Sequence, residues 1–263
     1  MIPKKLHYVW LGNGEKPDVF KRCLESWREF CPDYEIKEWG DEELRKSGNR
    51  FALEAAANRK FAFASDFLRL KALYDEGGFY CDTDCEILRP LDKFLNEDFV
   101  CCNYKTHGAI WLNTAFIGCA PENPLIGGLL ASYADKSMID ERGELDLAPN
   151  SCEWLSIIEE KFHVSFADAV FPLKLGERMT IYPSDYFCDS RDGYAFHHLT
   201  GTWVDAWQRK LILRFGRYRF CKFVHKSHRK GSEKVLTPEL RVGERCLCSL
   251  RIGRKKFFML LAR

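Results

Sequence analysis

Three features that would assign the chain to other protein classes are missing from its 263 residues. There is no run of about 18 consecutive apolar residues, so no segment predicts a membrane-spanning helix. The N-terminus lacks the apolar core of a signal peptide, which favours a cytoplasmic protein with reduced thiols. No Gly-x-Gly-x-x-Gly motif follows the first predicted strand, so a dinucleotide cofactor is not expected.

Cysteine is abundant, with twelve residues, but its spacing gives no zinc-ribbon pattern. Cys246 and Cys248 have no second pair at the spacing that a structural zinc site requires. Cys81 and Cys85 flank a pair of aspartates and are expected to face the core, since free cysteine packs as a small apolar residue. We therefore expect buried thiols rather than disulfides or a structural metal.

The net charge of +2 hides a strong asymmetry along the chain. Residues 206–263 contain 17 Lys or Arg and three Asp or Glu, whereas the preceding 205 residues contain 23 basic and 35 acidic side chains. Such a split predicts an acidic catalytic body, residues 1–205, and a basic extension, residues 206–263, that contacts something anionic.

The start of the basic extension carries aromatic and aliphatic residues at helical spacing. This pattern predicts a basic amphipathic helix within residues 206–230 and favours association with an anionic membrane surface. Nucleic-acid binding is a less favoured alternative, and a solvated helix without a partner is a third. The apolar stripe comprises Trp203, Trp207, Leu211, Phe215 and Tyr218.

The stretch from residue 61 to residue 88 carries the most chemistry. Apolar residues at spacings of three and four predict a helix from Phe61 to Glu76, which Gly77-Gly78 then ends. The following residues have strand character, which would place Asp82 and Asp84 on one side of a strand. Two neighbouring carboxylates repel each other, and Mg²⁺ or Mn²⁺ relieves that repulsion with the oxygen ligands it prefers.

The rest of the pattern alternates strands with helices, and the strand–helix–strand order at its start is typical of a nucleotide-binding α/β fold with a right-handed crossover. Residues 135–146 lack a periodic apolar pattern and are expected to form a mobile loop over the site. Strands are predicted at residues 6–12, 35–39, 99–103, 110–119, 179–182 and 195–203. Helices are predicted at residues 17–30, within 41–58, and at 61–76, 124–133 and 152–162.

The central stretch resembles glycosyltransferase family 32, retaining enzymes with a DXD motif, and more distantly the glucosyltransferase domains of large clostridial toxins. The resemblance implies a GT-A-like, Rossmann-type mixed sheet flanked by helices. It extends to the opening strand, Ile2-Pro3-Lys4 and His7 to Gly12. The matching residues of the central stretch are Ala64-Ser65-Asp66, Arg69, Tyr74, Gly77-Gly78, Tyr80 and Asp82-Thr83-Asp84.

The resemblance also implies roles for individual residues of the donor site. Val9 and Trp10 at the end of the first strand would contact the base of the donor, Trp10 by stacking. Asp66 and Arg69 would contact hydroxyl groups of the donor sugar and ribose. Tyr80, Asp82 and Thr83 would line the donor site, and Asp82 and Asp84 would hold Mn²⁺ or Mg²⁺.

A second stretch, His197-His198-Leu199-Thr200-Gly201-Thr202-Trp203, resembles the segment that closes the catalytic domain of family 32. Adjacent residues of a strand point to opposite faces, so only one histidine can face the site, and we favour His198 as the third metal ligand. Thr202 and Trp203 would cover the diphosphate. Asn113 lies inside an apolar run. It either contacts the sugar donor or the acceptor substrate, or is simply a β-bulge or turn residue.

These expectations combine into a functional hypothesis. The resemblance implies a metal-dependent retaining glycosyltransferase that moves a hexose from a nucleotide-sugar, preferably a UDP-sugar, to a saccharide acceptor. The basic extension favours a lipid-linked acceptor at the inner membrane face, as in capsule or surface-polysaccharide synthesis. The alternatives are a GDP-mannose-dependent mannosyltransferase and a toxin-like transferase that acts on a protein. A non-catalytic sugar-nucleotide-binding protein is an alternative of a different class.

Overall fold

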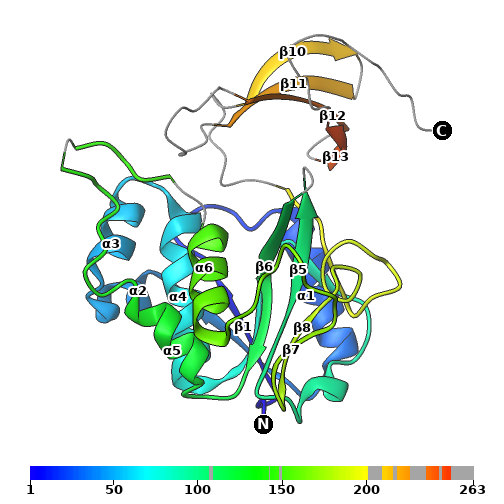
Figure 1. Ribbon diagram of the computed structural model, residues 1–263. Helices are drawn as coiled ribbons and strands as arrows, with labels where there is room; N and C mark the ends of the chain where they lie inside the picture. The colour runs from blue at the N-terminus through cyan, green and yellow to red at the C-terminus, as the bar shows by residue number, and fades with distance from the viewer. Residues whose placement is uncertain are drawn as a thin grey trace. The chain divides into compact units, whose positions relative to one another are not determined.

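The computed structural model describes residues 1–106, 109–141, 143–147 and 150–200, and four strands within residues 209–249. The chain divides into two compact units, Met1–His197 and His198–Arg263 (Figure 1). The division falls a few residues before the boundary at residue 205 that the charge pattern predicts. Each unit is described by itself.

The first unit is built on a seven-stranded mixed sheet with the strand order β2-β1-β3-β6-β5-β8-β7. β1 pairs in parallel with β2 and β3, whereas β6 runs antiparallel to both of its neighbours. The expected α/β fold with a mixed sheet is therefore confirmed. The strands are β1 (Lys5–Val9), β2 (Glu35–Trp39), β3 (Gly78–Cys81), β5 (Phe99–Thr106), β6 (Ala109–Cys119), β7 (Leu173–Gly176) and β8 (Met179–Tyr182).

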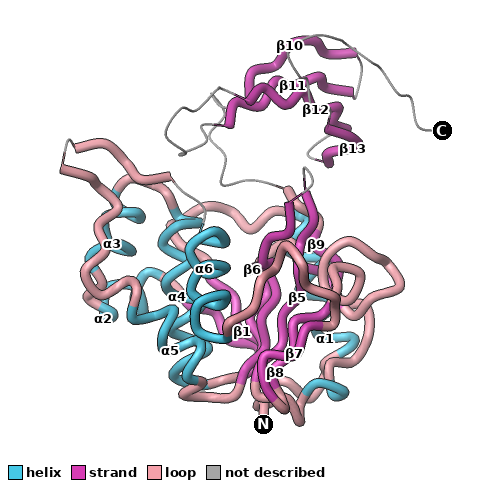
Figure 2. Tube along the Cα trace, in the orientation of Figure 1, coloured by secondary structure: helices cyan, strands magenta, loops and turns pink. Residues whose placement is uncertain are grey.

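Helices cover both faces of this sheet (Figure 2). One hydrophobic cluster joins the sheet to α2 through α6, and a second joins its other face to α1. No helix among the described residues is long and apolar enough to cross a membrane. The helices are α1 (Asp18–Phe30), α2 (Asp41–Ser47), α3 (Arg50–Ala57), α4 (Phe61–Glu76), α5 (Pro124–Ala131), α6 (Asn150–Phe162) and the short 3₁₀ helix η1 (Asp92–Phe94).

Two glycines connect α4 directly to β3, as the sequence predicts. Gly77 and Gly78 have φ angles of +62° and +98°, which residues with a side chain rarely adopt. A Cβ on Gly77 would lie 2.6 Å from the backbone nitrogen of Pro121, so the turn has no room for one. The buried His7 imidazole lies 2.8 Å from the Gly77 carbonyl oxygen. This junction fixes where β3 begins, and therefore where its far end places the aspartates.

The strand expected through residues 79–88 is wrong at its centre. β3 ends at Cys81, and a turn over residues 82–84 leads to β4 (Cys85–Ile87), which pairs with β9 (Ala195–His197) in a separate two-stranded sheet. The backbone N–H of Cys85 donates to the Asp82 carbonyl at 2.8 Å, which closes the turn. The two aspartates therefore come together through a turn and not along one strand face.

The second unit contains a four-stranded antiparallel sheet in the order β10-β11-β12-β13. The amphipathic helix predicted within residues 206–230 is therefore wrong, because its described part forms the strands β10 and β11. Aromatic residues alternate with a basic one from Tyr218 to Phe220, and aromatic side chains favour strands. The strands are β10 (Arg209–Phe215), β11 (Tyr218–His225), β12 (Val235–Val242) and β13 (Arg245–Ser249).

Candidate functional site

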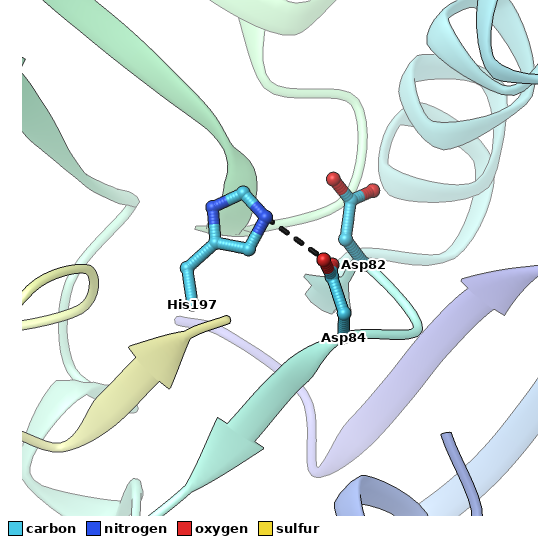
Figure 3. Close-up of side chains that lie close together, drawn as sticks. All are labelled: Asp82, Asp84 and His197. Carbon is cyan, nitrogen blue, oxygen red and sulfur yellow. Dashed lines mark ion pairs between the residues drawn. The ribbon is translucent and has the colours of Figure 1, made fainter. Parts of the chain in front are cut away.

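Two carboxylates and one imidazole converge where β3 ends (Figure 3). Asp82, Asp84 and His197 each offer a ligand atom, and these atoms all lie within 4.8 Å of one another. Nε2 of His197 lies 3.2 Å from Oδ1 of Asp84. All three side chains are partly exposed, so a ligand can reach them. This donor set fits a divalent cation, because carboxylate oxygens suit Mg²⁺ and Mn²⁺ and an imidazole is acceptable to Mn²⁺.

The pairing of β4 with β9 brings His197 to the aspartates. Cys85, the residue after Asp84, is the register partner of His197. The backbone N–H of His197 also donates to the Cys188 carbonyl at 2.8 Å, which fixes the end of β9 from its other side. The histidine is therefore positioned by backbone contacts from two segments.

The arrangement differs from the prediction of His198 as the third ligand. β9 ends at His197, and it is this imidazole that the cluster contains. His198 follows on the chain and begins the second unit. Neighbouring residues of an extended chain point to opposite sides, so one histidine of the pair was expected at the site. Strand register selects which one, and the local sequence pattern does not reveal that register.

Arg69 of α4 links the turn that carries Asp82 to β6 and to Asp66 on its own helix. Its Nη1 donates to the Thr114 carbonyl at 2.6 Å. Its Nη2 lies 2.9 Å from Oδ1 of Asp66 and 3.4 Å from Oδ1 of Asp82. The guanidinium lies over the Tyr80 ring, 4.7 Å from its centroid. The Arg69 side chain is only 5% exposed, so this charge is held in place by fixed partners.

Asp66 has an unusual protonation equilibrium. Burial raises the pKa of its carboxyl to about 7, although the adjacent Arg69 opposes the shift. A carboxyl that titrates near neutrality can accept a hydrogen bond from a hydroxyl group or donate one to it. Asp66 is thus suited to a polar ligand that presents hydroxyl groups.

At His197 the neighbouring charge, and not burial, decides the direction of the pKa shift. Burial disfavours the imidazolium, but the adjacent Asp84 carboxylate outweighs burial and raises the pKa of His197 well above its ordinary value. A metal binds the neutral imidazole, so a cation at this site competes with that proton. Either a proton on His197 or a cation can therefore offset negative charge of the two aspartates.

Trp10 lies directly after β1, at the same carboxyl end of the parallel strands where ligands bind in open α/β sheets. One face of its indole stacks on Phe20, with ring centroids 5.7 Å apart and an interplanar angle of 8°. Its Nε1 donates to the Gly14 carbonyl at 3.2 Å. Val9 is buried in the core. The base-contacting roles of Val9 and Trp10 stay predictions.

Four further residues were expected at or near the site: Thr83, Asn113, Thr202 and Trp203. Thr83 lies in the aspartate turn and is partly exposed. Asn113 is buried, and its Oδ1 accepts from the Ala115 N–H at 2.9 Å, which supports the structural alternative for this residue. Thr202 and Trp203 lie outside the described residues, so their roles stay predictions.

The loop expected over the site is tied to α3 in its described part. Oε2 of Glu54 accepts from the Ser137 hydroxyl at 2.7 Å and from the Met138 N–H at 2.8 Å. Lys136 of the same loop forms an ion pair with Glu153 of α6. Local sequence patterns do not predict these contacts, because they join segments far apart in the chain.

Comparison with known proteins shows which part of the chain has recognised relatives. Residues 17–100 match the family described as "Glycosyltransferase sugar-binding region containing DXD motif". The match is to the same class of proteins, DXD-containing glycosyltransferases, that the sequence resembles. The matched region contains Asp66, Arg69, Tyr80, Asp82 and Asp84, whereas His197 lies beyond it.

One curated relative is inositol phosphoceramide mannosyltransferase 3 of Schizosaccharomyces pombe (strain 972 / ATCC 24843). It is 31% identical over 99 residues, which cover 36% of this chain and 28% of the relative. The chain thus matches little more than a quarter of that protein's length.

Two solved structures have partial similarity to the fold. "PaToxG Glycosyltransferase" has a TM-score of 0.47 and 18% identity, with coverage of 62% of this chain and 70% of that chain. A second structure, that of a transferase mutant, has a TM-score of 0.40 and 12% identity, with coverage of 64% of this chain and 88% of that chain.

Proposed function

We propose that this protein is a metal-dependent glycosyltransferase of the family 32 type, with a GT-A-like catalytic domain, which moves a hexose from a nucleotide-sugar to a saccharide acceptor. One observation carries the proposal. The buried Arg69 network and the Asp82–Asp84–His197 cluster share Asp82, so the groups that would bind the sugar and the cation meet at one carboxylate. The DXD family match over residues 17–100 supports the same reaction class.

Asp82, Asp84 and His197 are the residues that would hold the cation, Mn²⁺ or Mg²⁺. When bound, the cation would act as a Lewis acid that stabilises negative charge on the leaving nucleotide diphosphate. A metal binds the neutral imidazole, so cation binding would displace the proton of His197, and the raised pKa of His197 would weaken cation binding at low pH.

Asp66 and Arg69 would position the donor sugar. Arg69 keeps the Asp66 and Asp82 carboxylates at fixed distances, so neither has to reorganise when a sugar binds. The Asp66 carboxyl would then bind a sugar hydroxyl. Holding the reacting groups in place in this way supplies a large part of the rate in many transfer reactions.

Retention of configuration is inferred from the resemblance to family 32. The bond from the anomeric carbon to the phosphate oxygen breaks, and the acceptor oxygen bonds to the same face of the sugar. The acceptor proton passes to the leaving phosphate oxygen. This route requires no carboxylate as general base.

The donor and the acceptor are proposed from the relatives and from charge. A UDP-sugar is the preferred donor, with Trp10 stacking on the base. Transfer of mannose from GDP-mannose is the second candidate, because the fission-yeast relative is named as a mannosyltransferase. The same name includes inositol phosphoceramide, which supports a lipid-linked acceptor. Such an acceptor agrees with the basic composition of residues 206–263.

The experiment is a screen of UDP-sugars and GDP-sugars with Mn²⁺, Mg²⁺ or a chelator, read out as release of the free nucleotide. We expect metal-dependent hydrolysis of one donor sugar, and loss of that hydrolysis in Asp84→Asn. Saturable donor binding without hydrolysis or transfer would instead identify a non-catalytic sugar-nucleotide-binding protein.

A further inference from the structure

Two basic side chains on the surface of the first unit form no ion pair with any residue that the structure describes. They are Arg89, which follows β4, and Lys93 of η1, and both residues are exposed. Asp92, which directly precedes Lys93, pairs instead with Lys4 at 2.6 Å. Both positive charges are therefore available to an anion from outside the chain.

Both cations lie against the same tyrosine ring. The Arg89 guanidinium is 5.9 Å from the centroid of Tyr194, and the Lys93 ammonium is 5.2 Å from it. Lys93 is also 5.5 Å from the centroid of Tyr186, whose ring stacks on Tyr194 with the centroids 5.9 Å apart. A hydrogen bond to the Tyr194 hydroxyl raises the pKa of Lys93, so the ammonium stays charged. The two charges therefore converge on one aromatic surface, where ring faces attract cations.

The rings beneath these cations are fixed by backbone contacts and by packing. The Tyr194 N–H donates to the Tyr186 carbonyl at 2.7 Å, and the Leu88 N–H donates to the Tyr194 carbonyl at 2.8 Å. The buried Phe94 packs edge-on against Tyr194, with the ring centroids 4.8 Å apart. Phe94 follows Lys93 in η1, so the same packing places the lysine. A site built in this way needs little rearrangement to bind a ligand.

This cluster is separate from the proposed cation site of the donor. Tyr194 precedes His197 by three residues, which is about 10 Å along an extended strand. It directly precedes β9, and neighbouring residues of an extended chain alternate between its two faces. Tyr194 and His197 therefore lie on opposite faces. An anion held by Arg89 and Lys93 would be a different group from the donor diphosphate.

We propose that Arg89 and Lys93, together with the Tyr194 hydroxyl, bind a phosphate group of a second ligand. The planar guanidinium offers paired donors that match phosphate oxygens, and the ammonium adds a compact charge with further donors. A phosphate has more acceptor oxygens for these donors than a carboxylate has. Phosphate esters occur in lipid headgroups and in soluble sugar phosphates, and either can supply the group. Only a role of this ligand as the acceptor would rest on the proposed function.

The test measures binding of glycerol phosphate to the full chain by calorimetry, with a chelator present so that no metal carries the phosphate. The site variant is Arg89→Gln with Lys93→Gln. The control is Arg45→Gln with Lys46→Gln, which removes the same two types of charge from exposed positions of α2. We expect the site variant to lose at least about tenfold in affinity, because hydrogen bonds to charged groups are lost. The control should change by about twofold or less, because salt screens exposed charges outside the site.

Equal losses in the two variants would overturn the proposal, and so would absence of glycerol phosphate binding by the unmodified chain. Acetate that binds as tightly as glycerol phosphate would contradict the preference for phosphate. Arg89→Gln alone serves if the double variant does not fold, with an expected loss of at least about threefold.

Cosedimentation with vesicles of phosphatidylcholine and phosphatidylglycerol separates the two sources of the phosphate. Vesicle binding that requires Arg89 and Lys93 would identify a lipid headgroup. Binding of glycerol phosphate without such vesicle binding would identify a soluble phosphate ester. Metal-dependent nucleotide release from the donor should be unchanged in the site variant, so this proposal and the transferase activity can fail separately.

Discussion

Tyr80 and Arg69 both bind the same oxygen of Asp82. The Tyr80 hydroxyl donates to Oδ1 at 2.7 Å, and Nη2 of Arg69 lies 3.4 Å from it. Oδ2 has no such partner among the described residues, so it is the oxygen that a cation at the Asp82–Asp84–His197 cluster would use. The orientation of the Asp82 carboxylate is thus set by α4 and β3 before any ligand binds.

We predict that Tyr80→Phe weakens cation binding with little loss of stability. The ring stays buried and keeps its packing, and only the hydrogen bond to Asp82 is removed. Residues that orient a metal ligand typically contribute about 10-fold to 100-fold in metal affinity. A Mn²⁺ titration, in which electron paramagnetic resonance measures the free Mn²⁺, gives the change in affinity. Tyr34→Phe is the control, because Tyr34 is also buried but its hydroxyl has no hydrogen-bond partner within the described part of the chain. Equal affinities in Tyr80→Phe and the unmodified protein would contradict the assigned role.

Replacement of Arg69 should be far more damaging than replacement of its partner Asp66. Arg69→Met leaves the Thr114 carbonyl without its donor and two carboxylates without their cation, and breaking a buried ion pair costs about 3–5 kcal/mol. Asp66→Asn keeps the shape of the side chain, and a carboxyl with a pKa of about 7 is already partly neutral at pH 7. We expect the second variant to lose about 1 kcal/mol or less. Denaturant unfolding at pH 7 measures both, and similar losses would refute the central position of Arg69.

The stability of the first unit should depend on pH through Glu76, at the end of α4. Burial opposes ionisation, but hydrogen bonds from Lys37 and Lys5 outweigh it and lower the pKa of Glu76 to about 2. A carboxyl with a lowered pKa in the folded state stabilises the fold above its ordinary pKa, and this contribution is lost as the pH falls. Glu76→Gln should therefore be less stable than the unmodified protein at pH 7. The difference should shrink between about pH 4.5 and pH 2.

The control for Glu76 is Glu42→Gln. Glu42 pairs with Lys46 on the exposed face of α2, and such surface pairs contribute little to stability because water and salt screen them. Thermal unfolding at several pH values compares the two variants. A stability difference for Glu76→Gln that stays constant down to pH 2 would show that this carboxylate is not held by the two lysines.

Local sequence patterns predicted the elements that position the site, and failed where distant segments meet. The apolar periodicity from Phe61 to Glu76 and the following glycines predicted α4 and its end. The break at Asp82 depends on pairing between Cys85 and His197, which are far apart in the chain. The Thr114 carbonyl that binds Arg69 carries no sequence signal, because every residue has a carbonyl group.

The prediction for the basic extension failed for a different reason. Apolar residues at positions 211, 215 and 218 fit a helix, but Tyr218, Arg219 and Phe220 also alternate as in a strand. Both periods are present over this short segment, and antiparallel pairing between β10 and β11 decides between them. The charge of the segment is the same in a helix and in a strand, so it could not distinguish the two.

The central claim is that His197, with Asp82 and Asp84, binds the cation that the proposed reaction needs. Mn²⁺ titration of His197→Ala and His198→Ala tests it most directly, because the two variants remove the same side chain from neighbouring positions. We predict that His197→Ala lowers the affinity for Mn²⁺ at least about tenfold. His198→Ala should bind Mn²⁺ as the unmodified protein does. Loss of affinity in His198→Ala with none in His197→Ala would contradict the site described for this protein.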